Sequence, residues 1–363
     1  MKNNNPFLFT AIIMIIIAMQ ACKVSHSKVK KQVQATVDLS VMQFNAWGAG
    51  DGVDKYRNLR AGSGFEAIVD EIAAHDPDVV TLSEVNGPSA KKIIEALAKK
   101  GKTYYTFTTT RNPSIISRYP ITYNSSINHF RSNPETDPTH GLCKLIIKVK
   151  DHEVAVYSGH LDYTNYACYL PRGYDGVSWS ALSAPVTDPG KILAQNAGST
   201  RASNIQDFID SAKADIARNR TVILGGDFNE PSHLDWTENT KNLFDHNGVV
   251  VPWPVSKALK ENGFIDSYRA MYPNEVDYPG FTWVAQKSWT PLSDERDRID
   301  FIYYYARNNI TLTSSVIVGP KESIVKDKPV AETSKDRFLL PVGIWPTDHK
   351  AVLSKFKIQL PGE

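Results

Sequence analysis

The sequence contains few cysteines, no long hydrophobic run and no internal repeat. With three cysteines in 363 residues, the fold has to rest on a buried core, which a chain of this length can supply without disulfide bonds. The apolar run from Phe7 to Met19 spans about a dozen residues, fewer than the ~20 that a membrane-spanning helix needs. No repeat period and no Gly/Ser-rich linker divides the body of the chain, so a repeat architecture is not predicted.

The chain also lacks a strong excess of charge of either sign. It has 41 Lys and Arg against 39 Asp and Glu. Five of the basic residues and none of the acidic ones precede Asp38, which leaves 36 basic and 39 acidic residues in the body. A protein that grips duplex nucleic acid usually presents a strongly basic face. We therefore do not expect duplex nucleic acid to be a partner.

The first 38 residues predict export and membrane attachment. Lys2, the short apolar run and the sequence Gln20-Ala21-Cys22 are typical of a signal peptide. A small residue before a cysteine resembles a bacterial lipoprotein signal, in which Cys22 becomes the lipidated first residue; ordinary cleavage nearby is the alternative. We therefore predict a lipoprotein signal peptide over 1–21 and a basic, flexible tether over 22–38. The protein would be anchored in the cell envelope through Cys22, on a periplasmic or outer-surface face.

From 39 to 359 the pattern predicts one α/β domain. Short β-branched or apolar runs predict strands at 40–44, 79–83, 115–116, 142–149, 154–159, 221–225, 299–304 and 351–356. Apolar residues at three-to-four spacing predict helices at 65–74, 90–99 and 194–217. Cys143 and Cys168 lie in this domain. The sequence leaves open whether they form a disulfide, because bridging depends on how closely their Cα atoms approach.

Polar side chains follow several of these strands at the point where each strand ends. Asn45 ends the first strand, Glu84 ends the second, and His160 follows the strand at 154–159. In α/β folds the loops at such strand ends gather on one rim of a sheet and commonly form the site. A hard cation takes oxygen ligands of the Asn and Glu kind. Each residue alone is also compatible with a cap, a solvated side chain or a structural histidine.

Three further elements make the pattern more specific. The sequence Gly225-Gly226-Asp227-Phe228-Asn229 follows a strand, and its two glycines predict a tight turn that brings Asp227 and Asn229 toward one site. The other two elements supply two carboxylates and a second imidazole, which are Asp300, Asp348 and His349. An acid next to a potential base is typical of proton-transfer chemistry.

Together and in this order, these elements resemble the endonuclease/exonuclease/phosphatase superfamily, which includes DNase I-like nucleases, neutral sphingomyelinases and inositol-phosphate phosphatases. The resemblance extends from Val41 to His349. It implies a DNase I-like, four-layer α/β sandwich with two mixed β-sheets packed face to face and flanked by helices. It also implies attack of water on a phosphate ester, assisted by Mg²⁺ or Mn²⁺.

The resemblance implies a role for each site residue. Glu84 would be the principal metal ligand, helped by Asn45 and Asp348, and Asp227 would orient or deprotonate the water. The remaining residues would hold phosphoryl oxygens or exchange protons, and these are Asn229, His160, His349 and, through an imidazole, Asp300. Some family nucleases carry a second acidic ligand two residues after the first-strand Asn, where this chain has Trp47. A single, weaker metal site is therefore expected.

The long segment after His160 predicts a wall of the substrate pocket. Its aromatic residues, beginning with Tyr163, could stack on a sugar, base or lipid head group, and Arg172 could pair with a phosphate. The same aromatics could instead pin an irregular loop to the body. Arg118, in an element that also resembles the family, is a third candidate substrate-binding residue.

Three functions are compatible with this pattern. The favoured one is a monomeric, metal-dependent phosphoesterase for small, lipid-linked or sugar-linked phosphate esters. A secreted DNase I-like nuclease would share the catalytic residues but would need a basic groove. A non-catalytic binding lipoprotein is disfavoured because every expected catalytic element keeps its polar residue.

Overall fold

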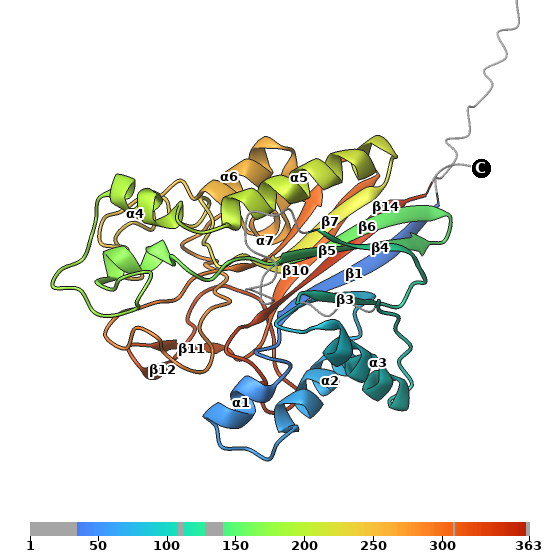
Figure 1. Ribbon diagram of the computed structural model, residues 1–363, viewed down its shortest axis with the longest axis horizontal. Helices are drawn as coiled ribbons and strands as arrows, with labels where there is room; N and C mark the ends of the chain where they lie inside the picture. Colours follow the sequence, from blue (N-terminus) through green and yellow to red (C-terminus); the bar gives the residue numbers. More distant parts are fainter. Residues whose placement is uncertain (1–34, 108–111, 128–140, 308, 361–363) are drawn as a thin grey trace, which may run out of the picture. The chain divides into compact units, whose positions relative to one another are not determined.

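Two six-stranded β-sheets pack face to face at the centre of the protein (Figure 1). The computed structural model describes residues 35–107, 112–127, 141–307 and 309–360. The predicted signal peptide and most of the predicted tether lie outside these residues. The first strand begins at Thr36, so the last residues assigned to the tether belong to the sheet.

The first sheet has the strand order β13-β10-β14-β1-β2-β3. Its central strand β1 runs antiparallel to β14 and parallel to β2. In chain order its strands are β1 (Thr36–Asn45), β2 (Val79–Ser83), β3 (Ser114–Ser117), β10 (Ile310–Val318), β13 (Phe338–Leu339) and β14 (Ala351–Gln359).

The second sheet has the order β4-β5-β6-β7-β9-β8. Here β6 and β7 are parallel, and β9 runs antiparallel to β7. In chain order its strands are β4 (Ile121–Ile127), β5 (Gly141–Val149), β6 (His152–His160), β7 (Thr221–Asp227), β8 (Phe264–Asp266) and β9 (Asp300–Tyr305). A separate hairpin joins β11 (Glu322–Val325) to β12 (Lys328–Ala331).

Helices cover the outer faces of the two sheets, which makes the sandwich four layers deep (Figure 1). Helices α2 (Ser63–His75) and α3 (Gly87–Lys99) pack on the first sheet, and α5 (Arg201–Ala217) and α6 (Pro254–Glu261) pack on the second. The remaining helical segments are α1 (Asp51–Tyr56), η1 (Ala167–Arg172), α4 (Pro189–Asn196) and α7 (Ser267–Met271). The predicted fold class, two mixed sheets flanked by helices, is confirmed.

The side chains along β1 explain where the site lies. Because alternate residues of a strand point to opposite faces, Met42 packs in the core under the helices, whereas Leu39 and Val41 lie in the core between the sheets. The next two residues on that inner face are Gln43 and Asn45, both fully buried. The space between the sheets is therefore apolar at one end and polar at the other, and the polar end holds the site.

All eight predicted strands are present, but one predicted helix is wrong. The segment predicted as a single helix at 194–217 forms two helices, α4 and α5, because the chain turns at Gly198-Ser199-Thr200 between them. The side chain of Asp162 accepts a hydrogen bond from the backbone N–H of Thr200 at 2.9 Å. Asp162 lies two residues after His160, so this hydrogen bond connects the turn to the segment that carries His160.

The structure also answers the question about the cysteines. Cys143 and Cys168 are both buried and unpaired. Burial raises the pKa of each thiol well above its ordinary range, so neither is a reactive thiolate at neutral pH. Among the residues that the structure describes, no helix has the length and apolar character needed to cross a bilayer.

Gly225 and Gly226 do not form the predicted turn but lie inside β7. A Cβ atom at Gly225 would lie 2.2 Å from the Thr81 Oγ1 of the facing sheet, and one at Gly226 would lie 2.6 Å from the Gly159 carbonyl oxygen. The two glycines therefore allow close approach of the backbone next to Asp227. Gly225 allows the two sheets to pack closely, and Gly226 allows close packing of neighbouring strands within the second sheet.

We expect Gly225→Ala to lower the free energy of unfolding by about 1–3 kcal/mol, because the added methyl group forces the two sheets apart. Denaturant-induced unfolding followed by circular dichroism measures the change. Gly343→Ala is the matched control, since a Cβ there meets no atom within 4 Å. Equal stability of the two variants would show that the sheets accommodate the methyl group.

Candidate active site

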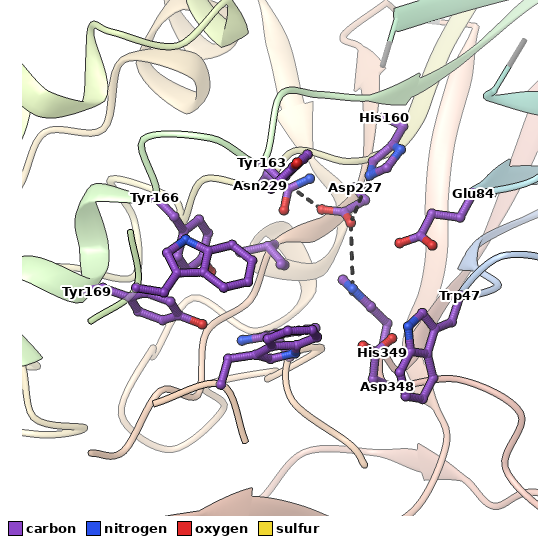
Figure 2. A pocket seen from close by; sticks show the side chains of 14 residues that line it. Trp47, Glu84, His160, Tyr163, Tyr166, Tyr169, Asp227, Asn229, Asp348 and His349 are labelled. Carbon is purple, nitrogen blue, oxygen red and sulfur yellow. Dashed lines mark hydrogen bonds and ion pairs between the residues drawn. The ribbon is translucent and has the colours of Figure 1, made fainter. Parts of the chain in front are cut away.

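A pocket opens at the polar end of the sandwich, where β2, β6 and β7 end. Its cavity volume is about 180 Å³. Figure 2 shows Glu84 and Trp47 on one side of Asp227 and His349, Asp348 below His349, and the tyrosines of the loop after β6 on the opposite side. The residues lining the pocket are Trp47, Glu84, His160, Tyr163, Tyr166, Tyr169, Trp179, Asp227, Asn229, Trp283, Trp289, Ile299, Asp348 and His349.

Asp227 lies at the centre of the polar half of the pocket. Its Oδ2 accepts a hydrogen bond from Asn45 Nδ2 at 2.8 Å, and its Oδ1 accepts one from the backbone N–H of Asn229 at 2.9 Å. The Nε2 atoms of His160 and His349 lie 3.8 Å and 3.7 Å from Oδ2. Burial raises the pKa of Asp227, although the neighbouring His349 opposes the shift. This carboxylate is therefore fixed in place and flanked by two imidazoles.

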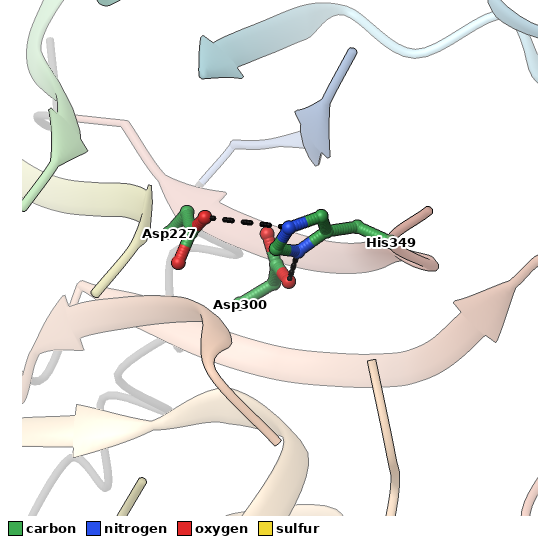
Figure 3. Close-up of side chains that lie close together, drawn as sticks. All are labelled: Asp227, Asp300 and His349. Carbon is green, nitrogen blue, oxygen red and sulfur yellow. Dashed lines mark hydrogen bonds and ion pairs between the residues drawn. The ribbon is translucent and has the colours of Figure 1, made fainter. Parts of the chain in front are cut away.

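His349 contacts two carboxylates (Figure 3). Its Nδ1 is 2.9 Å from Oδ2 of the fully buried Asp300. Burial alone would lower the pKa of His349, but Asp300 and Asp227 raise it well above its usual range. At neutral pH the ring is therefore an imidazolium, with Nδ1–H donating to Asp300 and Nε2 lying 3.7 Å from Asp227 Oδ2.

A buried network of hydrogen bonds holds the Asp300 side chain in place. Gln43 Nε2 donates to Asp300 Oδ1 at 3.3 Å and to Ser83 Oγ at 3.1 Å. Thr81 Oγ1 donates to Gln43 Oε1 at 2.6 Å. Ser83 Oγ in turn donates to the Gly159 carbonyl oxygen at 3.1 Å. These contacts link both sheets beneath the site and fix the orientation of the His349 ring.

Glu84 and Asp348 are the two pocket carboxylates best suited to a cation. Burial raises the pKa of Asp348, His349 lowers it, and the neighbouring charge of Glu84 raises it again, which gives a pKa of about 7. The two carboxylates therefore lie close enough to repel each other. A divalent cation bound by oxygen ligands would relieve that repulsion, so the residues present fit a metal ion.

A second group of possible ligands fits a metal less well. Ligand atoms of Asp227, Asp300 and His349 lie within 4.8 Å of one another. However, His349 Nδ1 already bonds to Asp300 Oδ2 at 2.9 Å, so that nitrogen and that oxygen are engaged with each other. An imidazole must lose the proton on its ligating nitrogen before it binds a metal. These three residues are better described as a proton-carrying chain.

Asn45 has a positioning geometry instead of the expected ligand geometry. Its Oδ1 accepts the backbone N–H of Trp47 at 3.0 Å, and its Nδ2 donates to Asp227 and, at 3.3 Å, to Glu84. Its side chain is fully buried and lies beneath the pocket. Asn45 therefore aligns the two carboxylates with each other.

Asn112 is a site residue that the sequence analysis missed. Its Nδ2 lies 2.7 Å from His160 Nδ1, and its Oδ1 accepts the backbone N–H of Glu84 at 2.8 Å. Glu84 has a φ of +58°, a left-handed conformation that carries strain for a side chain other than Gly, Asn or Asp. One Asn side chain thus holds both the Glu84 backbone and the His160 ring.

The other half of the pocket is an aromatic chamber. We use this name for six residues, four from the loop after β6 and two from the loop before β9: Tyr163, Tyr166, Tyr169, Trp179, Trp283 and Trp289. Trp179 packs edge-on against Tyr163, Tyr169 and Trp289, at centroid distances of 6.1, 6.2 and 5.2 Å. Only the first loop was expected from the sequence. Trp283 and Trp289 of the second loop do not directly follow a predicted strand, so the pattern of polar residues at strand ends did not indicate them.

The structure corrects the expectation for Arg172. Its side chain is fully buried and forms two hydrogen bonds with the carboxylate of Asp297, which also accepts Trp236 Nε1 at 3.1 Å. Removing a buried guanidinium from such a partner costs several kcal/mol. Arg172 therefore anchors the loop after β6 and lies outside the pocket lining.

Arg118 is also placed away from the pocket. It follows β3, whose Ser117 is paired with Val79, at the end of β2 opposite to Glu84. Its guanidinium forms an ion pair with Asp76 and lies over the Tyr104 ring. The expected contact with substrate is therefore corrected to a contact at the far end of the sheet.

An α/β sandwich with buried carboxylates and histidines at the sheet ends defines a class of hydrolases that act on phosphoester bonds. Within that class the chain belongs to the endonuclease/exonuclease/phosphatase family, whose model matches residues 42–349. It is 28% identical over 277 residues to the uncharacterized protein F14F9.5 of Caenorhabditis elegans, covering 73% of this chain and 78% of that protein.

Solved structures show the same fold at low sequence identity. The human Nocturnin catalytic domain with a bound sulfate anion superposes with a TM-score of 0.52 at 15% identity, covering 89% of this chain and 97% of that one. A Bacteroides thetaiotaomicron protein of the same family gives 0.51 at 17% identity over 90% and 100%. A humanized D. rerio TDP2 gives 0.51 at 15% over 88% and 98%. These similarities support the fold assignment.

Proposed function

We propose that the protein is a divalent-metal-dependent phosphoesterase that hydrolyses small, lipid-linked or sugar-linked phosphate esters. The observation that carries the proposal is the charge of the pocket. Four buried or half-buried carboxylates, from Glu84, Asp227, Asp300 and Asp348, surround two imidazoles. An anionic phosphate would be repelled from such a site unless a cation offset the charge.

Each polar residue has a role in this proposal. Asp227 accepts a proton from the attacking water, whose oxygen forms a new bond to phosphorus while the ester P–O bond breaks. The imidazolium of His349 donates from Nε2 to the developing charge, and His160 lies on the other side of Asp227. A Mg²⁺ or Mn²⁺ held by Glu84 and Asp348 would supply charge neutralisation.

A panel of p-nitrophenyl phosphate esters tests the proposal directly. We expect release of p-nitrophenol that stops in EDTA and returns when Mg²⁺ or Mn²⁺ is added in excess. Glu322→Gln, which changes an exposed acid at the start of β11, controls for nonspecific effects of acidic residues. Full turnover in chelator would exclude the metal-dependent mechanism.

We further propose that the enzyme is anchored in the cell envelope through lipidated Cys22. The support is the short apolar run before Cys22 and the four lysines that follow it before Asp38. A single acyl chain binds a membrane only marginally, whereas the multiply acylated cysteine of a bacterial lipoprotein would hold firmly.

We expect Cys22→Ser to move the protein from the membrane fraction to the soluble fraction without changing kcat, because the site begins at Asn45. Cell fractionation with an activity assay measures the change, and mass spectrometry of the mature N-terminus identifies the lipid. A mature chain that starts elsewhere, or an unmodified Cys22, would contradict the anchor. Neither result would affect the enzyme assignment.

A further inference from the structure

Two cavities meet at Glu84. The first is the pocket with the aromatic chamber, and the second is an open groove beside α1 that we call the lysine groove. Glu84 and Trp47 line both cavities. A phosphoryl group held at Glu84 would therefore have space on two sides. The other side chains that define the lysine groove are Asp51, Lys55, Tyr56 and Lys287.

The pocket that contains the aromatic chamber has room for one compact group. The volume of the whole pocket is about 180 Å³, and a cavity of about 150 Å³ in another protein holds a benzene molecule. The ring planes of Tyr169 and Trp289 both lie nearly perpendicular to that of Trp179, at 82° and 77°. Such walls suit an apolar-faced ring.

The lysine groove has a different chemistry. Its volume is about 530 Å³, and it carries the ammonium groups of Lys55 and Lys287 together with the carboxylates of Asp51 and Glu84, of which Glu84 is assigned to the cation. Neither lysine forms an ion pair with any residue in the described part of the chain. Lys287 Nζ lies 4.3 Å from the centre of the Trp289 ring, so it stands where the groove and the chamber adjoin. Two available ammonium groups suit an arm that carries oxygen acceptors.

We propose that the substrate is a phosphodiester, with one ring-sized alcohol in the aromatic chamber and an oxygen-rich second arm in the lysine groove. This inference rests on the proposed function and selects a diester over a monoester. Hydrolysis consumes one water: its oxygen joins phosphorus, the P–O bond to the ring-sized alcohol breaks, and that alcohol receives a proton. The products are the free alcohol and a phosphate monoester of the second arm.

Three p-nitrophenyl esters with the same leaving group test the proposal. They are p-nitrophenyl phosphate, methyl p-nitrophenyl phosphate and the p-nitrophenyl ester of thymidine 5′-phosphate, whose second arms increase in size. We expect kcat/KM to rise in that order. The kcat/KM for the thymidine ester should exceed that for the methyl ester by about tenfold or more, as expected for one charge-assisted hydrogen bond.

The double variant Lys55→Ala/Lys287→Ala should remove most of this difference between the two diesters. The control is Lys355→Ala/Lys357→Ala, which removes the same charge from exposed positions on β14 and should preserve the difference. A preference for the monoester, or a ratio between diesters that the groove variant does not change, would overturn the inference and leave the proposed function intact. Absence of metal-dependent hydrolysis for all three esters would overturn both.

Discussion

Replacing Glu84 with Gln is expected to lower kcat by about 10³-fold, since metal-derived charge stabilisation contributes several kcal/mol to the transition state. The Glu84 carboxylate accepts one hydrogen bond, at 3.3 Å, from Asn45 Nδ2. Its exchange for an amide removes one of the two charges that fit the cation. The Asn45 contact and the volume of the side chain are largely preserved.

The metal affinity of this variant separates binding from chemistry. Titration of Mn²⁺ followed by isothermal calorimetry should show a dissociation constant weakened by about tenfold or more, the cost of one lost charged ligand. Circular dichroism should show an unchanged fold, because Glu84 lies at the surface of the pocket and outside the hydrophobic cores. A variant with unchanged kcat and unchanged Mn²⁺ affinity would remove Glu84 from the proposed metal site.

The strand ends could be predicted from the sequence because their signal is local. In β1 the alternation of side chains and the change from apolar to polar residues both lie within one run of ten residues. In β7 the same holds for the residues that precede Asp227. Such runs are specified by neighbours in the chain, so they predicted the strands and the region of the site, whereas the four-layer fold was implied by the resemblance to the family.

The missed features depend on contacts between distant residues. Asn112 reaches His160 across 48 positions, and Arg172 pairs with Asp297 across 125. The position of Arg172 shortly after His160 favoured a substrate contact, because nothing in its neighbourhood in the sequence indicates a buried partner. Strand β4 was missed for another reason: most of its residues are exposed, so it has no apolar run to detect.

His349→Gln is the second change with a large expected effect, about 10²-fold or more on kcat. The imidazolium contacts Asp300 and Asp227 and contributes its positive charge to a pocket that is otherwise acidic. Glutamine keeps a hydrogen-bond donor but loses that charge. His233→Gln is the matched control, since His233 bonds to Ser256 Oγ at 2.8 Å and lies outside the pocket lining.

Asp300 acts on the substrate only through His349, and a double-mutant cycle tests this. We expect Asp300→Asn alone to lower kcat by about tenfold or more, because it weakens the hydrogen bond that orients the ring. Once His349 is replaced by Gln, the same change should have little further effect, since residues that act as one unit are not additive. Losses that multiply in the double variant would instead give Asp300 an independent role. If Asp300 were only structural, Asp300→Asn would lower the free energy of unfolding, and its effect on kcat would be the same whether residue 349 is His or Gln. The free energy of unfolding and kcat are therefore measured for the wild type, the two single variants and the double variant.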